Sequence, residues 1–192
     1  MKRSFFARDS RIVAPDLLNK LLVRGDRVGR IVEVEAYCGA EDPASHAYRG
    51  RTDRNAVMFG PAGHLYVYFT YGMHFCANVV CGEEGVASAV LLRGLTPVAG
   101  LDEMRSLRPL ARTDRDLCSG PARLAQAFGL NRSFNGADLV TVDRGVTIED
   151  DGTRPPAAPD GLGVSVRIGV AAGADLPWRF YVPGAVGLSR KG

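Results

Sequence analysis

The sequence predicts one mixed α/β domain (α+β) built around a mostly antiparallel sheet. Its apolar, strand-like stretches follow one another through tight turns, without the crossover helices that parallel strands need. The chain has 192 residues, enough for one domain with a substantial core. Because we find neither internal repeats nor a dividing linker, we expect residues 1–192 to form a single unit.

The N-terminal part predicts a helix followed by a strand. Residues 1–10 are expected to be a loose lead-in. A helix is predicted over 16–23 from the apolar positions Leu17, Leu18, Leu21 and Leu22. Residues 29–37 then alternate as a strand, with Ile31, Glu33, Glu35 and Tyr37 on one face.

Residues 63–80 predict a hairpin. Two apolar strands are joined by a tight turn near Tyr71 and Gly72, where glycine supplies the positive φ of a short loop. A further strand is expected over 87–92.

Helices and strands alternate in the remaining chain. One helix is predicted over 100–107, and a second runs to Phe128, with Ser119 as N-cap, Pro121 in its first turn and Gly129 as its stop. A strand over 145–149 precedes an exposed loop over 150–163, which is rich in Pro, Asp and Gly. Closing strands are expected over 164–170 and 179–182.

Two carboxylates share one face of the predicted strand 29–37, at Glu33 and Glu35, beside the ring of Tyr37. Like charges so close raise each other's pKa, as partial burial does, and a carboxylate of raised pKa takes a proton from water more readily. The pattern therefore indicates a general base. A half-exposed strand with a solvated polar face explains it equally well.

Tyr71 stands at the tip of the predicted hairpin, where a large ring would ordinarily be left in solvent. An exposed aromatic side chain near basic residues suits a wedge that enters between stacked bases. Ordinary packing on the sheet accounts for Tyr66 and Tyr68 but not for Tyr71.

Composition excludes several classes of protein. Hydrophobic residues make up 46% and charged residues 23%, an ordinary globular balance. Since no apolar run has the length of a membrane span and residues 1–8 lack a signal peptide's apolar region, we expect a soluble, cytoplasmic protein. The spacing of the cysteines matches no zinc site, so we expect free thiols, no metal and no cofactor; these are Cys38, Cys76, Cys81 and Cys118.

Arginines form two clusters along the chain. Guanidinium groups donate two hydrogen bonds to a phosphate at once, so Arg49, Arg51 and Arg54 are candidate contacts to a nucleic-acid backbone. A second cluster comprises Arg105, Arg108, Arg112 and Arg115. GC-rich coding bias and an ordinary solvated surface explain the same residues.

Short motifs run in order along nearly the whole chain. They are Glu-Val-Glu-Ala-Tyr over 33–37, Glu-Asp-Pro-Ala-Ser-His over 41–46, Arg-Asn-Ala-Val-Met-Phe-Gly-Pro over 54–61, Leu-Tyr-Val-Tyr over 65–68, Tyr-Gly-Met over 71–73, Asn78, Leu-Leu-Arg over 91–93, Leu-Cys-Ser-Gly-Pro over 117–121 and Arg-Phe-Tyr-Val over 179–182. In this ordered combination the chain resembles the alkyladenine (3-methyladenine) DNA glycosylase family, bacterial type. The resemblance implies a compact domain with a curved antiparallel sheet, a protruding hairpin and peripheral helices.

The resemblance also implies a repair reaction on duplex DNA. A damaged purine would be flipped into a pocket, and its N-glycosidic bond hydrolysed to leave an abasic site. Glu35 matches the general base that aims water at C1′, and Arg93 matches the partner that orders this carboxylate and its water. Glu33 is assigned only a neighbouring electrostatic or structural role.

Further family positions imply how the base is held. Tyr37, His46 and Tyr68 match the side chains that sandwich the flipped base, and Asn78 matches the one that screens against the amino group of guanine. Tyr71 matches the side chain that fills the gap in the stack. Without the resemblance, a hydrogen-bonded loop histidine would be the preferred interpretation of His46.

Lysine is scarce, which bears on the reaction type. Of 24 basic residues only Lys2, Lys20 and Lys191 are lysines, and none lies near the site motifs. A glycosylase that also cuts the strand needs an amine nucleophile. A monofunctional enzyme is therefore expected.

The chain departs from the family pattern at a few positions. Asp53 stands where bacterial relatives often carry proline, which weakens the assignment of Arg51 and Arg54 to phosphates. Phe69 and Thr70 precede Tyr71 where two aliphatic residues are more usual.

Two other functions compete with this interpretation. A metal-dependent hydrolase would use one of two ligand sets, but the spacing of neither matches an established site. The first is Glu33, Glu35, Asp42 and His46, and the second is His64, His74, Cys76 and Cys81. A non-catalytic damaged-DNA-binding module would keep the surface and lack turnover, which the presence of both Glu35 and Arg93 argues against. The sequence leaves the lesion range open, and a monomer is the simplest expectation.

Overall fold

The computed structural model of the protein describes residues 1–157 and 161–190. Strand β2 (Arg27–Tyr37) is the centre of its sheet, because it pairs with three other strands. One edge pairs with β5 (Ala89–Ala99). The other pairs first with β1 (Leu21–Arg24) and then with β8 (Arg179–Tyr181). These pairings are antiparallel, as predicted.

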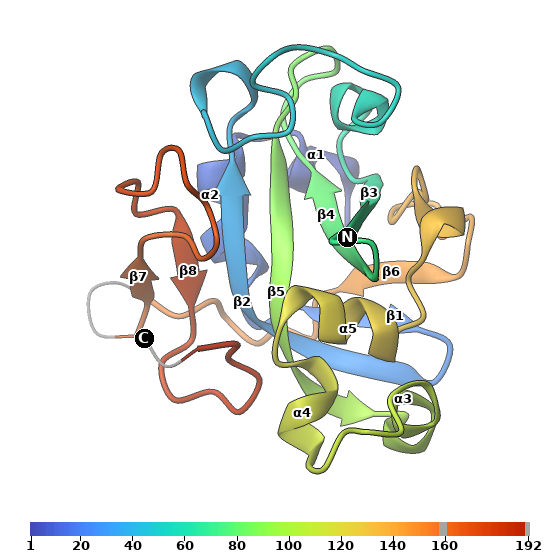
Figure 1. The fold of residues 1–192 in the computed structure, drawn as a ribbon. Helices are drawn as coiled ribbons and strands as arrows, with labels where there is room; N and C mark the ends of the chain where they lie inside the picture. The colour runs from blue at the N-terminus through green and yellow to red at the C-terminus, as the bar shows by residue number, and fades with distance from the viewer. Residues whose placement is uncertain (158–160, 191–192) are drawn as a thin grey trace.

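The remaining strands extend this centre into a curled sheet of eight strands in the order β3-β4-β5-β2-β1-β6, with β7 pairing β8. Their bounds are β3 (Leu65–Thr70), β4 (His74–Val80), β6 (Val146–Glu149) and β7 (Gly163–Ser165). Figure 1 shows β2 and β5 running lengthwise through the molecule, with β1 and β6 turned across them at one end. The predicted class, one compact α+β domain with a curved antiparallel sheet, is confirmed.

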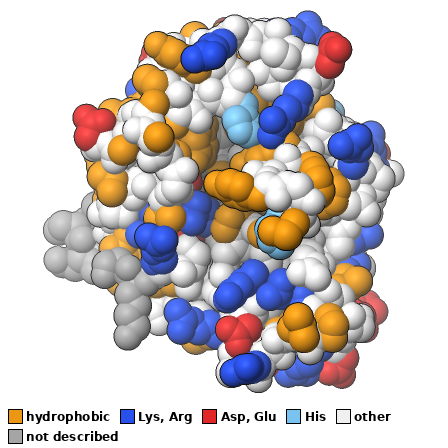
Figure 2. Space-filling view, viewed as in Figure 1, with side chains coloured by type: hydrophobic (Ala, Val, Ile, Leu, Met, Phe, Trp, Pro, Cys, Tyr) orange, Lys and Arg blue, Asp and Glu red, His pale blue; other side chains and the backbone are white. Residues whose placement is uncertain are grey.

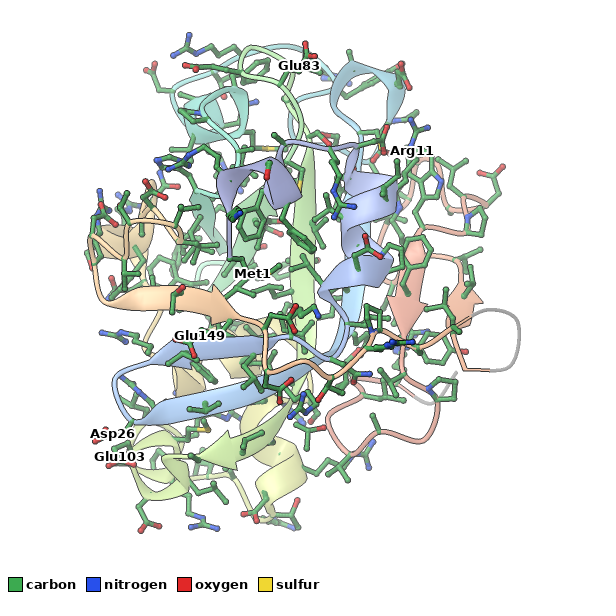
Figure 3. The ribbon with its side chains drawn as sticks, turned by 180° about the vertical axis from the view of Figure 1, so that it is seen from behind. Met1, Arg11, Asp26, Glu83, Glu103 and Glu149 are labelled. Carbon is green, nitrogen blue, oxygen red and sulfur yellow. The ribbon has the colours of Figure 1, made fainter. Side chains whose placement is uncertain are left out.

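Short helices cover the sheet. Seen from behind in Figure 3, α1 (Arg3–Phe6) and α2 (Ser10–Leu17) lie against the sheet. On the other side lie α3 (Leu101–Leu107), α4 (Asp114–Cys118) and α5 (Pro121–Ala127), and 3-10 turns are formed by η1 (Gly39–Glu41), η2 (Ala56–Phe59) and η3 (Arg132–Phe134). Fully buried Leu17, Ile31, Leu92 and Phe128 belong to one core between these layers. In the described residues no helix combines the length and the apolar character needed to cross a bilayer.

Several predicted elements are confirmed. The hairpin is β3–β4, and Met73 N donates to Thr70 O across the turn at 3.2 Å. The helix over 100–107 is α3 and the strand over 145–149 is β6. In the predicted loop 150–163, residues 150–154 are exposed, and residues 158–160 lie outside the described part.

The secondary structure predicted for the N-terminal residues is wrong in two places. The lead-in 1–10 contains α1, whose Phe6 is 1% exposed. The predicted helix 16–23 ends at Leu17, and Leu21–Arg24 is a strand placed between β2 and β6. Its leucines fit a helical period, but hydrogen-bonded strands on both sides outweigh that local preference.

Two smaller differences affect the site. The N-cap of α5 is Gly120, not Ser119, whose hydroxyl instead accepts from Arg123 Nη1 at 3.1 Å. The predicted strand 164–170 is confined to β7, so residues 166–170 leave the sheet. This departure frees the backbone amide of Ile168 for a side-chain partner.

Phe6 is expected to contribute to stability as a core residue. Phe6→Ala will lower the free energy of unfolding by about 3–5 kcal/mol, because it removes a buried ring and leaves a cavity. Urea unfolding measures the difference. The matched control is Lys2→Ala, an exposed change in the same segment, with an expected effect within about 0.5 kcal/mol. Equal effects of the two changes would contradict the burial of α1.

Candidate active site

A paired irregularity in the β2–β5 ladder brings three charged side chains together. The pairing skips Val32 on β2 and, just beyond, Arg93 on β5. An extra residue in one strand bends it locally and redirects a side chain. As a result the guanidinium of Arg93 reaches both Glu33 and Glu35, which are fully buried.

Glu33 accepts hydrogen bonds from three residues. Arg93 Nε donates at 3.1 Å and Arg179 Nε at 2.8 Å, while Ser189 donates its backbone N–H at 2.6 Å and its hydroxyl at 2.7 Å. Burial alone would raise the pKa of Glu33, but the Ser189 and Arg179 donors and the charge of Arg93 hold it below its usual 4.5. The expectation that paired carboxylates raise each other's pKa is therefore wrong for Glu33. Sequence reasoning did not find Ser189, because it lies 156 residues away.

Glu35 is enclosed by polar donors. Its Oε2 accepts from Tyr37 Oη at 2.9 Å and from Arg93 Nη1 at 3.2 Å, and its Oε1 accepts from the Ile168 amide at 2.7 Å. Burial, followed by the Glu35 charge, raises the pKa of Tyr37, so its phenol stays protonated and donates. The alternative of a half-exposed strand with a solvated polar face is wrong.

Behind Tyr37 lies a buried ion pair. The guanidinium of Arg167 donates to both carboxylate oxygens of Asp42, at 2.6 and 2.8 Å, and both side chains are fully buried. The same group lies 4.6 Å from the centroid of the Tyr37 ring and 5.1 Å from that of Trp178. This clamp fixes the ring of Tyr37 and the neighbouring amide of Ile168. Asp42 was considered only as a metal ligand from sequence, and Arg167 was hidden in a predicted strand.

A cavity of about 340 Å³ opens beside this network. It brings together most of the side chains predicted for a base pocket and a wedge, namely Tyr37, His46, Tyr68, Asn78, Arg93 and Tyr71. Glu35 lies directly behind Tyr37 and Arg93 rather than on the surface of the cavity. Figure 2 shows the molecular surface hollowed beside the hairpin on this face.

His46 and Tyr68 form one wall of the cavity. Their rings meet edge to face with centroids 4.5 Å apart, and Tyr66 stacks on Tyr68 at 5.4 Å. His46 Nδ1 is 3.0 Å from Tyr66 Oη, which confirms that the histidine is hydrogen-bonded. Partial desolvation and the charge of Arg54 lower the pKa of His46 from 6.5, so the imidazole is neutral at pH 7.

Tyr71 projects from the hairpin tip and is 83% exposed. Its φ is 51° and that of Gly72 is 66°, which gives two successive left-handed residues in the turn. A bulky residue in this region is strained and is found mainly where function requires it. Figure 2 shows hydrophobic side chains gathered around the hairpin, with Lys and Arg side chains above and below.

The basic loop differs from the second arginine cluster. Arg49, Arg51 and Arg54 are exposed, and Arg54 Nη2 donates to Phe69 O in the hairpin at 3.3 Å. In the second cluster Arg105 is paired with two carboxylates of α3 and α4, Asp102 at 2.8 Å and Asp114 at 2.6 Å. The loop beside the cavity is thus the better candidate for phosphate contacts.

The described lysines lie away from the cavity. Lys20 is buried against Asp150 with a 2.8 Å contact, and Lys2 is exposed near the N-terminus. Lys191 lies outside the described residues. Within residues 1–157 and 161–190, no group of three His, Cys, Asp or Glu side chains has the geometry of a metal site.

The chain is similar to known proteins over almost its whole length. A family model described as methylpurine-DNA glycosylase matches residues 4–186. Three relatives share the name "Putative 3-methyladenine DNA glycosylase". The one from Burkholderia lata is 57% identical over 96% of this chain and 88% of its own length. Those from Carboxydothermus hydrogenoformans and Methanoculleus marisnigri are 50% and 47% identical, over 100% and 98% of this chain and 99% and 97% of their own lengths.

The lowered pKa of Glu33 makes its contribution to stability depend on pH. Glu33→Gln will lower the free energy of unfolding by about 3–5 kcal/mol at pH 7, because it leaves two arginines without their shared carboxylate. A depressed folded-state pKa means that this stabilisation is complete above the usual value of 4.5 and is lost as pH falls through the folded pKa. Urea unfolding at pH 7 and pH 3 will therefore show a smaller difference at the lower pH. Glu103→Gln, an exposed change on α3, is the control; a difference that grows on acidification would contradict the assignment.

Proposed function

The chain belongs to the methylpurine-DNA glycosylase family and is a DNA N-glycosylase, and from this we propose which lesions it removes and how. It flips alkylated or deaminated purines out of duplex DNA, hydrolyses the N-glycosidic bond and leaves an abasic site. The lesion class comprises 3-methyladenine, 7-methylguanine, hypoxanthine and ethenoadenine. One observation carries the proposal: an aromatic cavity is lined by Arg93, which donates to the buried Glu35 behind it, and lies beside the exposed ring of Tyr71.

The cavity supports binding of a flat base. Because His46 and Tyr68 touch each other, they make a single wall, and the purine lies between this wall and Tyr37. An alkylated purine carries positive charge and is attracted to aromatic faces by roughly 0.5–2 kcal/mol. A neutral His46 adds no opposing charge. Asn78, whose Nδ2 donates to Tyr66 O at 3.1 Å, is held at the cavity surface and screens against guanine.

Glu35 acts as the general base. Water enters beside Arg93, Glu35 takes its proton and the oxygen attacks C1′, while the electrons of the N-glycosidic bond leave with the base. A cationic 3-methyladenine or 7-methylguanine departs as a neutral base, whereas a neutral lesion such as hypoxanthine must be protonated as it leaves. The carboxylate also stabilises the positive charge that develops on the sugar. In the free protein Glu35 accepts three hydrogen bonds, which leaves one of the roughly four acceptor positions of its carboxylate for water.

Tyr71 fills the space that the flipped nucleotide leaves. Its exposed ring and strained backbone at the hairpin tip support insertion from the minor groove. Arg49, Arg51 and Arg54 contact the phosphate backbone beside it.

The remaining proposals concern the working form of the protein. Residues 1–192 act as one glycosylase domain and as a monomer on DNA in the cytoplasm, associated with the nucleoid. Catalysis needs neither cofactor nor metal. A non-catalytic damaged-DNA-binding module is the alternative, and the ordered contact between Glu35 and Arg93 speaks against it.

Excision by Glu35 can be tested on defined duplexes. Oligonucleotides carrying one hypoxanthine or ethenoadenine, or alkylated DNA, are incubated with enzyme in EDTA, and half of each reaction receives hot alkali. Strand breaks are expected only after alkali, because neither lysine of the described residues, Lys2 or Lys20, lies near the site. Glu35→Gln will abolish them, with a loss of at least about 1,000-fold.

The controls separate chemistry from binding. Glu103→Gln should excise like the wild type, and Glu35→Gln should still bind lesion DNA. If Glu35→Gln excises normally, the assignment of the base is wrong. If the wild type leaves every lesion intact but binds DNA, the non-catalytic module is correct.

A change at the wedge should separate stability from activity. Tyr71→Asn will leave the free energy of unfolding unchanged or raise it by up to about 1 kcal/mol, because asparagine tolerates positive φ. It will slow single-turnover excision from duplex DNA by at least about tenfold, since flipping costs a few kcal/mol that the ring no longer offsets. Tyr71→Phe is the control and should retain activity. An asparagine variant as active as the wild type would exclude Tyr71 as the wedge.

A further inference from the structure

Glu33 connects the segment 187–190 to the arginine of the active site. We propose that Glu33 and Ser189 are positioning residues that hold Arg93 so that Glu35 stays available to accept a proton from water. The proposal rests on the proposed role of Glu35 as general base. It assigns a catalytic purpose to a carboxylate that the sequence leaves with only a neighbouring role.

The contacts of Arg93 are divided between two carboxylates and a serine. Its Nε donates to Glu33 Oε1 at 3.1 Å, its Nη1 to Glu35 Oε2 at 3.2 Å, and its Nη2 to Ser189 Oγ at 3.4 Å. A planar guanidinium held at three nitrogens has no freedom to rotate. Glu33 therefore fixes Nε of the Arg93 guanidinium, and only Nη1 reaches Glu35, the proposed general base.

Charge balance explains why Glu33 is needed. Its Oε1 accepts from Arg93 and also from Arg179, so one buried carboxylate holds two guanidinium groups. Without that charge the two cations repel each other, and Glu35 becomes the carboxylate nearest to Arg93. Arg93, which already donates to Glu35 through Nη1, then turns a second nitrogen toward Glu35 and takes the remaining acceptor position that water needs.

The segment 187–190 is seated on the paired irregularity of β2 and β5. A Cβ on Gly187 would lie 2.1 Å from Leu95 O, and one on Gly94 would lie 2.4 Å from Gly187 O, so the backbones touch only because both residues are glycine. Arg179 Nη2 also donates to Arg190 O at 3.2 Å. This close approach delivers both donors of Ser189 to Glu33. The family model matches only to residue 186, so the segment lies beyond the part it describes.

A purely structural role predicts different behaviour. A buried ion pair that only maintains the fold changes stability when it is broken, and the folded fraction retains its rate. A positioning role changes the rate of the folded enzyme and depends on Arg93 being present. The two roles separate in single-turnover kinetics with a double-mutant cycle.

The experiment uses the full chain and the lesion duplex that the wild type excises best, with enzyme in excess. Glu33→Gln is expected to slow single-turnover excision by about 10- to 100-fold, while its affinity for the duplex stays within about twofold. In a background of Arg93→Gln, the same change should alter the remaining rate by less than about twofold, because the group it positions is gone. Ser189→Ala keeps every charge and should slow excision less than Glu33→Gln, again only when Arg93 is present.

Two matched controls report structural damage alone. Asp138→Asn breaks another ion pair with a buried carboxylate, to the partly exposed Arg3 at 2.7 Å, and should lower the melting temperature without slowing excision at 25 °C. Arg190→Ala changes an exposed side chain in the same segment and should leave the rate unchanged.

The outcomes separate the two proposals. The positioning role is overturned if Glu33→Gln, like Asp138→Asn, lowers the melting temperature without slowing excision. It is also overturned if Glu33→Gln slows excision by the same factor whether or not Arg93 is present. If Glu33→Gln does not fold, Ser189→Ala decides the matter, and an unchanged rate overturns the proposal. An active Glu35→Gln would instead refute the proposed general base, whatever Glu33 does.

Discussion

The other features of the structure depend on one constraint: the carboxylates and guanidinium groups buried at the centre of the sheet must balance each other's charge. Charged groups removed from water are tolerated only when they are paired and hydrogen-bonded. Glu33 and Glu35 of β2 meet Arg93 of β5 and Arg179 of β8, so three strands contribute to one network. The paired irregularity of β2 and β5 is therefore the feature that lets the sheet carry a network of buried charges in its interior.

The two walls of the cavity are held in place by different contacts. Tyr37 is fixed from behind by Arg167 and Asp42, whereas His46 and Tyr68 hold each other in place. Tyr71, the proposed wedge, stands apart on a strained, exposed turn. The cavity, whose walls are held by these contacts, thus lies beside an exposed hairpin tip that is free to contact DNA. Precise chemistry on a large, deformable substrate requires such a pairing of a fixed site with an accessible element.

The sequence predicted best what local pattern or ordered motifs determine. The β3–β4 hairpin follows from alternation and a glycine turn, and the cavity brings together Tyr37, His46, Tyr68 and Asn78 as the motifs implied. Leu21 and Leu22 were assigned to a helix because only pairing with β2 and β6 makes them a strand. The bonds of Ser189 to Glu33 and of Ile168 to Glu35 join distant segments, so no local spacing could reveal them.

The hydrogen bond from Ser189 to Glu33 bears on the order in which parts of the protein fold. It joins residues 156 positions apart in the sequence. Contacts of such sequence separation form slowly, because the chain loses the entropy of closing the loop before the contact contributes any stabilisation. The hairpin and its aromatic rings depend mainly on nearby sequence, so we expect them to be in place earlier. If Glu33 and Ser189 position Arg93 as proposed, hydrolytic activity is then reached only after the sheet has closed, and an incompletely folded copy releases no bases from DNA.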